Sequence, residues 1–300
     1  MKIKILRNIS RAFRLAFLAA SVLPFIFGSL IDKSDFNFVG FILGLIAVSA
    51  THLSANLIND YADSRSGADW QDKRFYKFFG GSKLIQEGVV AGNFYFKTAL
   101  FFALFAFFSV LGLSYIQGSF KVIGFYLLII FLGWAYSCKP LQLSYRHFGE
   151  IIIFLLFGPA VVMGGYFIQT GIFPDAKSFI LSLPFGIFTC AILFVNEIPD
   201  FPEDKRAQKL TWVDFLGAAR SYLLYAVLMF LAFSAIGVSI GLGYLGKIAL
   251  FSFILVLPAL KAIDILRLKF SDKIELTQSS RLTIVIQGLA GVILILDKLL

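Results

Sequence analysis

Two clusters of acidic side chains are the part of this chain best suited to chemistry. They occupy residues 56–63, with the sequence NLINDYAD, and residues 196–204, with the sequence NEIPDFPED. On a helix, Asn56, Asp60 and Asp63 stand at i, i+4 and i+7, so they share one face. Mg²⁺ prefers carboxylate oxygens together with phosphate oxygens. The two clusters therefore predict one shared divalent-cation site.

Within these clusters, the four aspartates are the expected metal ligands and catalytic residues: Asp60, Asp63, Asp200 and Asp204. We expect Asn56 and Asn196 to orient metal or phosphate, with Asn59 and Glu197 as secondary candidates. Two prolines, Pro199 and Pro202, argue against an undistorted helix through the second cluster. The simpler interpretation of either cluster alone is a solvated helix end, but that interpretation does not explain why two matching clusters occur.

A diphosphate at such a site needs further positive charge around its outer oxygens. The candidates are Lys73, Arg74, Lys83, Lys139, Arg146, Lys205 and Arg206. Lys83 stands out because it follows Gly80-Gly81-Ser82, whose backbone amides can approach an anion closely. Lys139 and Lys205 come next. For any single one of these residues, the alternative role is to fix the orientation of the chain in a membrane.

Three tyrosines and two histidines also lie near the acidic or basic segments. Tyr61, Tyr136 and Tyr145 lie beside the charged segments, where a ring face can stabilise a cation. His52 lies one helical turn before Asn56, and His147 follows Arg146. For both histidines, a structural hydrogen bond is the simpler prediction.

The composition identifies the setting of these residues. The chain is 59% apolar, 17% aromatic and only 15% charged, which is typical of a polytopic membrane protein. Apolar runs recur evenly along the chain, so we expect a single all-α domain over residues 1–300 embedded in a lipid bilayer. Cys138 and Cys190 show no metal-ligand spacing and are expected to be buried spectators.

Nine apolar runs are long enough to be membrane helices. The first ends near Ile31, and the others lie near residues 38–58, 95–116, 121–138, 150–170, 178–197, 221–242, 247–264 and 282–297. Nine spans with the N-terminus inside leave five lysines outside: Lys33, Lys121, Lys177, Lys247 and Lys298. The other 22 of the 27 Lys and Arg then lie inside, as the positive-inside rule requires. This distribution explains the net charge of +9 without a nucleic-acid partner.

This topology brings the two acidic clusters to the same place. Spans two and six both run inward, so each delivers its acids to the cytoplasmic end of the bundle. The long segments 59–94 and 198–220 follow them. We expect these segments to cap a central cavity that opens into the membrane, with the N-terminus and the active-site loops in the cytoplasm.

Several motifs together resemble the UbiA superfamily of intramembrane prenyltransferases. They are NDYAD at 59–63, the pattern NExxDxxxD at 196–204, and the nine spans. Within it, the chain is most similar to the 1,4-dihydroxy-2-naphthoate polyprenyltransferases of the menaquinone pathway. This likeness rests on NLINDYAD, on GAD at 67–69, on GGSK at 80–83, and on YRHFGE at 145–150 followed by FGP at 157–159. Many members have an aspartate where this chain has Gly67, and this departure leaves the roles of Asp69 and Asp72 open.

The resemblance implies a reaction and its partners. Mg²⁺ on Asp60, Asp63, Asp200 and Asp204 would bind a polyprenyl diphosphate, and an aromatic acceptor would capture the prenyl group. It also implies substrate contacts from Tyr136, Lys139, Tyr145 and Arg146. The bacterial inner (plasma) membrane is the expected location. The acceptor could instead be 4-hydroxybenzoate, homogentisate or a glycerol-phosphate lipid. An ion or proton transporter is the alternative from another class, and no pattern predicts an oligomeric state.

Overall fold

The computed structural model describes residues 2–67, 70, 72 and 74–300, and over these residues the protein is helical, with no strand. The first half contains α1 (Lys2–Ala12), η1 (Leu15–Phe17), α2 (Ala19–Ser29), α3 (Phe38–Ser66), α4 (Gly92–Gln117), α5 (Lys121–Ala135) and η2 (Leu143–Tyr145). The second half contains α6 (Gly149–Leu155), η3 (Leu156–Ala160), α7 (Val161–Thr170), α8 (Ala176–Arg206), α9 (Val213–Leu216), η4 (Ala218–Arg220), α10 (Ser221–Gly241), η5 (Ile248–Leu255), α11 (Val256–Leu268) and α12 (Lys273–Leu299).

Seven stretches of the described chain are long and apolar enough to cross a membrane. They are Phe38–Ser66, Gly92–Gln117, Gly149–Thr170, Ala176–Arg206, Ala218–Gly241, Ile248–Leu268 and Lys273–Leu299. The two other expected spans form shorter apolar helices, Leu15–Ser29 and Lys121–Ala135. Fifteen residues of α-helix extend only about 23 Å, less than the hydrocarbon thickness of about 30 Å.

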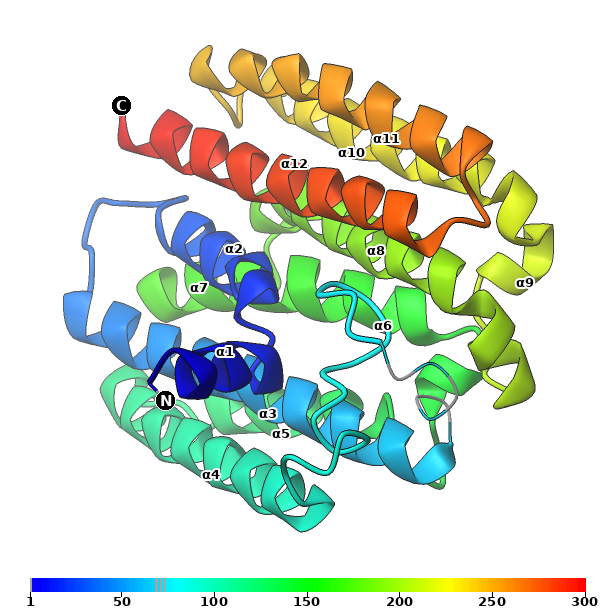
Figure 1. The fold of residues 1–300 in the computed structure, drawn as a ribbon. Helices are drawn as coiled ribbons and strands as arrows, with labels where there is room; N and C mark the ends of the chain where they lie inside the picture. Colours follow the sequence, from blue (N-terminus) through cyan, green and yellow to red (C-terminus); the bar gives the residue numbers. More distant parts are fainter. Residues whose placement is uncertain (1, 68–69, 71, 73) are drawn as a thin grey trace.

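Helix α8 packs against α10 and α12 on one side and against α2, α6 and α7 on the other. Three helices, α10, α11 and α12, lie together on one side, and α3, α4 and α5 lie together on the other, with α6, α7 and α8 between them (Figure 1). Of the most apolar window of α8, 72% is buried, a larger share than in any other candidate span of the described chain. Apolar side chains of α8, α10, α11 and α12 form one core cluster, and those of α3, α4, α5 and α7 contribute to a second.

Close backbone contact joins α8 to the π-helical turn η3. A Cβ atom placed on Gly158 of η3 would lie 2.7 Å from the Cα atom of Gly186 in α8, a separation that real Cβ atoms do not show. Only glycine permits this approach. The turn also contains Pro159, which removes one helical hydrogen bond and is accommodated by the wider π geometry.

The second cluster lies on a continuous helix, although its prolines argue against an undistorted one. Helix α8 runs unbroken from Ala176 to Arg206, although Pro184, Pro199 and Pro202 lie inside it. Each proline removes one amide donor, but its fixed φ is compatible with a helix. Neighbouring helices enclose α8 on several sides, and this packing outweighs the lost hydrogen bonds.

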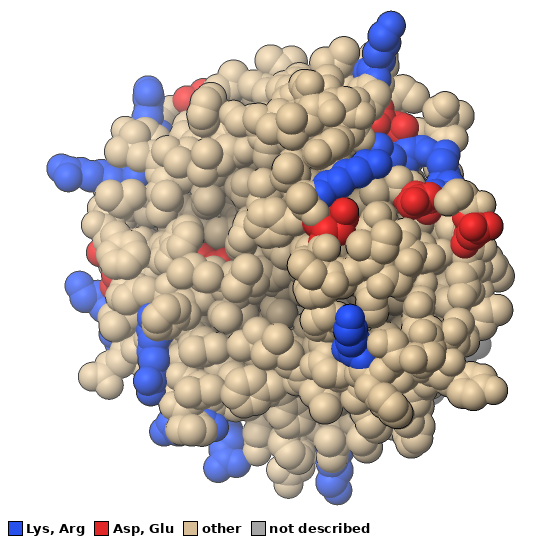
Figure 2. All heavy atoms as spheres, turned by 180° about the vertical axis from the view of Figure 1, so that it is seen from behind, with Lys and Arg blue, Asp and Glu red and all other residues tan. Residues whose placement is uncertain are grey.

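The surface has the character expected of a protein in lipid. Large apolar side chains are exposed on many of the helices, for example Phe108, Phe230 and Leu257 at 67%, 70% and 69%. Seen from behind, most of the surface is uncharged, and the charged side chains stand chiefly along the left and lower edges and in a mixed group at the upper right (Figure 2). The length and apolar character of its helices identify this protein as an integral membrane protein.

The carboxyl ends of α3 and α8 lie at the same end of the bundle, on the right in Figure 1. The segment between α3 and α4 crosses this end as an extended loop, and α9 packs against α8. Both acidic clusters occupy the last turns of these two helices. The fold thus joins two sequence-distant motifs under one loop.

Candidate active site

Acids from both clusters line one cavity of about 190 Å³. Asp63 reaches it from α3, and Asp200 and Asp204 reach it from α8. Five other predicted site residues share its wall: Asn56, Asn59, Tyr136, Asn196 and Glu197. Asp60 does not line it and is buried behind the loop, where only 3% of the residue is exposed.

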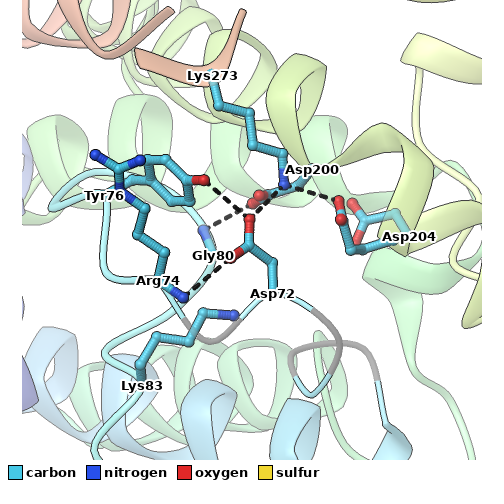
Figure 3. A pocket seen from close by; sticks show the side chains of 9 residues that line it. Asp72, Arg74, Tyr76, Gly80, Lys83, Asp200, Asp204 and Lys273 are labelled. Carbon is cyan, nitrogen blue, oxygen red and sulfur yellow. Dashed lines mark hydrogen bonds and ion pairs between the residues drawn. The ribbon is translucent and has the colours of Figure 1, made fainter.

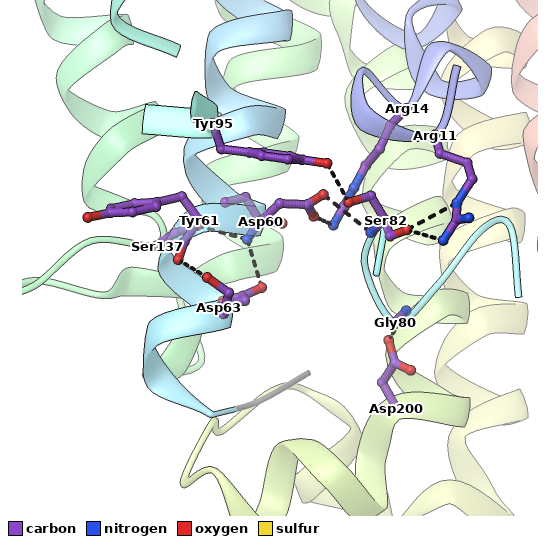
Figure 4. Close-up of polar contacts among 12 residues, drawn as sticks. Arg11, Arg14, Asp60, Tyr61, Asp63, Gly80, Ser82, Tyr95, Ser137 and Asp200 are labelled. Atoms are coloured by element: carbon purple, nitrogen blue, oxygen red, sulfur yellow. Dashed lines mark hydrogen bonds and ion pairs between the residues drawn. The ribbon is translucent and has the colours of Figure 1, made fainter. Parts of the chain in front are cut away.

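The Gly80-Gly81-Ser82 turn connects the two clusters through its backbone. The amide of Gly80 donates to Asp200 Oδ2 at 2.8 Å, and the amide of Ser82 donates to Asp60 Oδ2 at 3.2 Å (Figure 4). Gly80 and Gly81 have φ of +71° and +72°, which favours glycine. One short turn therefore presents N–H donors to one carboxylate from each motif, as expected of an anion-binding loop.

Arginines of the N-terminal segment complete the surroundings of Asp60. The guanidinium of Arg14 donates to Asp60 Oδ1, while Arg11 donates to the carbonyl oxygen of Ser82 at 2.8 Å. Arg14 also lines the 190 Å³ cavity. Sequence reasoning counted both arginines only toward membrane orientation. No local motif marks them, because their partners lie far along the chain.

Asp63 is held by two predicted residues. Asn59 Nδ2 donates to Asp63 Oδ2 at 3.0 Å, and the hydroxyl of Tyr145 donates to Asp63 Oδ1 at 2.8 Å. Burial, reinforced by the nearby Asp63 carboxylate, raises the pKa of Tyr145 above its ordinary value. The phenol therefore stays protonated and acts as a donor.

Asp204 is paired with a lysine that sequence reasoning missed. Lys209 Nζ lies 3.5 Å from Asp204 Oδ1, and Lys209 lines the same cavity. Burial alone would lower the pKa of Lys209. The nearby Asp204 and Asp63 carboxylates have the larger, opposite effect, so the pKa lies well above its ordinary value. Lys209 thus carries a positive charge into the site. The predicted Lys205 is exposed instead, with its ammonium 5.9 Å from the ring centre of Phe201.

A second, smaller pocket of about 10 Å³ lies beside Asp200 and Asp204. Lys83 and Lys273 point into it from different segments (Figure 3). Asp72 also lines it and accepts hydrogen bonds from Lys273 Nζ and from the hydroxyl of Tyr76, each at 3.0 Å.

Asp72 is charged in this arrangement. Burial raises the pKa of Asp72, but hydrogen bonds from the Arg74 amide, Lys273 and Tyr76 outweigh burial and lower it below the ordinary value. These donors use both carboxylate oxygens of Asp72. The arrangement places Asp72 in an ion-pair network at the second cluster.

Other predicted residues do not reach either pocket. Lys139 and Arg146 are exposed, and Arg146 donates to the carbonyl oxygen of Pro140. Tyr61 accepts a hydrogen bond from Arg65 and packs on Phe96 outside both pockets. Two further candidates, Asp69 and Lys73, lie outside the described residues.

The two histidines have different outcomes. His147 has the predicted structural contact, because its Nδ1 lies 3.0 Å from the carbonyl oxygen of Thr211. The same prediction was wrong for His52, whose two ring nitrogens have no hydrogen-bond partner. The cysteines are free, with Cys190 buried and Cys138 half-buried.

The donor set suits a magnesium ion by the type of its atoms. Asp63, Asp200 and Asp204 face one cavity, and the buried Oδ1 of Asn196 there has no hydrogen-bond partner. All four supply hard oxygen atoms. Among the described residues, however, no three His, Cys, Asp or Glu side chains already converge on a metal-sized site. The carboxylates are instead engaged by the protein's own donors, such as the Gly80 amide and Lys209.

An apolar cavity of about 460 Å³ adjoins the acidic one. Five residues line both cavities: His52, Ala55, Gly133, Leu156 and Phe157. The rest of the apolar wall comes mainly from α3, α5, η3 and α7. A ligand with a charged head and a long hydrocarbon tail would therefore meet a polar and an apolar compartment in succession.

Comparisons with known proteins agree with this architecture. The profile of the UbiA prenyltransferase family matches residues 21–284. The UbiA prenyltransferase domain-containing protein 1 of Dictyostelium discoideum is 27% identical over 221 residues, which cover 72% of this chain and 66% of that protein. The 1,4-dihydroxy-2-naphthoate octaprenyltransferase of Haemophilus influenzae is 24% identical over 206 residues, covering 67% and 65%. The chain thus matches just under two thirds of the length of these relatives.

Solved structures share the fold. A UbiA homolog from Aeropyrum pernix K1 has a TM-score of 0.73 at 16% identity, covering 95% of this chain and 98% of that one. A UbiA homolog from Archaeoglobus fulgidus, solved bound to DMAPP and Mg²⁺, has a TM-score of 0.64 at 16% identity, covering 95% and 98%. Because the family profile spans most of the sequence, this chain belongs to the UbiA prenyltransferase family.

Proposed function

We propose that this protein transfers a polyprenyl group from a polyprenyl diphosphate to an aromatic acceptor, with Mg²⁺ as cofactor. The observation that carries the proposal is the meeting of both acidic clusters at one cavity that adjoins a larger apolar cavity. The family relation and the magnesium and prenyl diphosphate in a structural neighbour support it. Asp63, Asp200 and Asp204 would hold the metal. Asp60, the fourth predicted ligand, would join them from its position behind the Gly80-Gly81-Ser82 turn.

The protein's own residues provide the rest of the diphosphate site. Bound there, Mg²⁺ would neutralise the charge that develops on the leaving diphosphate. Lys209, Arg14 and Lys83 supply positive charge around the same region. The apolar cavity would take the isoprenoid tail, and its walls would keep water from the allylic cation.

For the acceptor, we propose 1,4-dihydroxy-2-naphthoate. In this reaction the bond between the allylic carbon and the diphosphate oxygen breaks, and the electron pair leaves with the diphosphate. A new bond forms to the ring carbon that carries the carboxyl group, and that carbon loses CO₂. The direct product is the reduced, dihydroxy form of demethylmenaquinone, and a separate two-electron oxidation outside this reaction gives demethylmenaquinone itself. The similarity to the 1,4-dihydroxy-2-naphthoate octaprenyltransferase of Haemophilus influenzae supports this choice of acceptor.

We also propose that the chain crosses the bacterial inner membrane nine times around a central cavity, with the N-terminus and the acidic ends of α3 and α8 in the cytoplasm. The supporting observation is the location of the two shorter apolar helices, Leu15–Ser29 and Lys121–Ala135, at the two remaining expected spans. With nine crossings, Lys and Arg gather on the side that holds both acidic clusters.

Purified protein in lipid nanodiscs, supplied with farnesyl diphosphate and one acceptor at a time, tests the function. We expect prenylated product from dihydroxynaphthoate, and none after magnesium is removed with EDTA. Asp200→Asn and Asp60→Asn should each abolish turnover, whereas Asp35→Asn, at an exposed acid between α2 and α3, should not.

Three results would contradict parts of the proposal. Product from 4-hydroxybenzoate but not from dihydroxynaphthoate would refute the acceptor. Full activity in EDTA, or in both acid variants, would refute the metal site. Ion flux in proteoliposomes that depends on Asp60 and needs no prenyl diphosphate would favour transport instead.

A further inference from the structure

His52 is a buried polar side chain without a role in the site described so far. It lies on α3, four residues before Asn56, and only 6% of it is exposed. Neither Nδ1 nor Nε2 has a hydrogen-bond partner in the described structure. Most buried polar atoms in proteins are hydrogen-bonded, and leaving one unpaired costs free energy. The orphaned imidazole therefore indicates a ligand contact.

The position of His52 narrows the kind of ligand. Its side chain belongs to the wall shared by the acidic cavity and the apolar cavity. The ring of Phe157 meets it edge to face, with 5.4 Å between ring centroids and 89° between planes. His52 lies about 6 Å along the helix axis from Asn56, on the side away from the acids. It thus stands where the charged compartment ends.

Three parts of the substrates could approach this boundary: the isoprenoid tail, the diphosphate and the aromatic acceptor. Only the acceptor can hydrogen-bond the imidazole there. An isoprenoid tail has no hydrogen-bonding atoms, and a diphosphate would be held farther along α3, among the acids. A hydroxylated aromatic ring offers both an apolar body and O–H groups. A neutral imidazole provides one donor and one acceptor, and the unpartnered Nδ2 of Asn56 one turn away adds another donor.

We propose that His52 hydrogen-bonds a hydroxyl group of the aromatic acceptor and positions the acceptor ring at the boundary between the two cavities. This inference rests on the proposed prenyl transfer and adds the residue that recognises the acceptor. His52 is a positioning residue for the nucleophilic ring. Phe157 packs edge-on against the imidazole and helps to fix its orientation.

Two substitutions at this position separate recognition from structure. His52→Phe keeps an aromatic ring against Phe157 but removes both nitrogens, whereas His52→Gln keeps a donor and an acceptor. We expect His52→Phe to raise the KM for dihydroxynaphthoate about tenfold, the loss expected for one hydrogen bond. The KM for farnesyl diphosphate should stay within about twofold, and His52→Gln should recover most of the lost affinity.

Thermal unfolding gives a readout that does not need turnover. Removing two unpaired buried nitrogens should leave the Tm of His52→Phe equal to or above that of the wild type, since no protein contact is lost. Added dihydroxynaphthoate should raise the Tm of the wild type but not that of His52→Phe. Ser49→Ala, on the same helix and lining neither cavity, is the control and should behave as wild type.

The outcomes distinguish this inference from the function on which it rests. If wild-type protein transfers prenyl groups and His52→Phe retains the acceptor KM and the acceptor-induced Tm rise, the role of His52 is refuted. A lowered Tm with parallel increases of both KM values would show a purely structural role and also refute it. If wild-type protein yields no prenylated product, the proposed function fails, while the acceptor-induced Tm shift still decides whether His52 binds the acceptor.

Discussion

At the scale of single residues, Lys209 shows how a charge is brought into an apolar bundle. Its ammonium lies beside Asp204 in a cavity wall, with 15% of the lysine side chain and 6% of the aspartate side chain exposed. A buried charge needs a partner, because the loss of hydration is otherwise uncompensated. The Asp204 carboxylate therefore keeps the Lys209 ammonium charged at the place where a diphosphate would add negative charge.

Lys209→Met should lower prenyl transfer about a hundredfold, the effect expected when a charge-assisted contact to the leaving group is lost. It should also reduce the free energy of unfolding by about 3 kcal/mol, because Asp204 is left without its buried counter-ion. The double variant with Asp204→Asn should regain most of that stability but no activity. Steady-state kinetics and thermal unfolding in nanodiscs provide the measurements.

For Lys205, the sequence and the structure lead to opposite predictions about substrate binding. As a motif position, it was expected to bind substrate, whereas its side chain is exposed and its ammonium lies over the ring of Phe201. The Lys205→Met variant therefore decides between the two lysines. A larger loss of activity in Lys205→Met than in Lys209→Met would refute the assignment of Lys209.

At the scale of elements, the loop between α3 and α4 acts as a connector of the two acidic helix ends. Its amides at Gly80 and Ser82 hold one carboxylate from each helix, and Lys83 enters the smaller pocket. The loop therefore fixes the spacing of the acids before any substrate binds. Backbone donors suit this task, because they cannot rotate away as side chains do.

Gly80→Ala and Gly88→Ala form a matched pair in this loop. Both glycines have positive φ, +71° and +68°, so both alanines incur a backbone strain of about 1 kcal/mol. A Cβ on Gly80 would lie 3.3 Å from Lys83 Cε and 3.6 Å from Asp200 Oδ1, whereas a Cβ on Gly88 meets nothing within 4 Å. We expect similar losses of stability, but a fall in kcat/KM for the diphosphate only in Gly80→Ala. Equal kinetics in the two variants would show that the turn does not position the acids.

Some of the site residues could be predicted from the sequence alone, and others could not. Asp63, Asp200 and Asp204 were predictable, because charged residues at the ends of apolar runs contrast sharply with their surroundings. Arg14 and Lys273 were not, because their partners lie in other segments and no local pattern encodes the approach. Lys209 was missed because it follows the end of α8, where helical spacing no longer links it to Asp204. The unbroken course of α8 through three prolines likewise depends on tertiary packing. Hydrophobicity thus fixes the helices, whereas long-range contacts decide which charges meet.

At the scale of the whole molecule, the number of membrane crossings decides where the acidic site opens. The seven long apolar helices leave α2 and α5 as shorter ones. An odd number of crossings places the termini on opposite sides in either case, so labelling of the termini cannot distinguish seven crossings from nine. The loops on either side of α5 can, because they change sides only if α5 crosses.

We therefore expect Ser119→Cys and Lys139→Cys, which flank α5, to lie on opposite sides of the membrane. A membrane-impermeant thiol reagent should label Ser119→Cys in right-side-out vesicles and Lys139→Cys in inside-out vesicles. The background variant would carry Cys138→Ser and Cys190→Ala, since these are the two native cysteines. Ser34→Cys, between α2 and α3, should react from the same side as Ser119→Cys. If Ser119→Cys and Lys139→Cys reacted from one side, α5 would be a re-entrant helix, the nine-span topology would be wrong, and the positive-inside count would have to be redrawn.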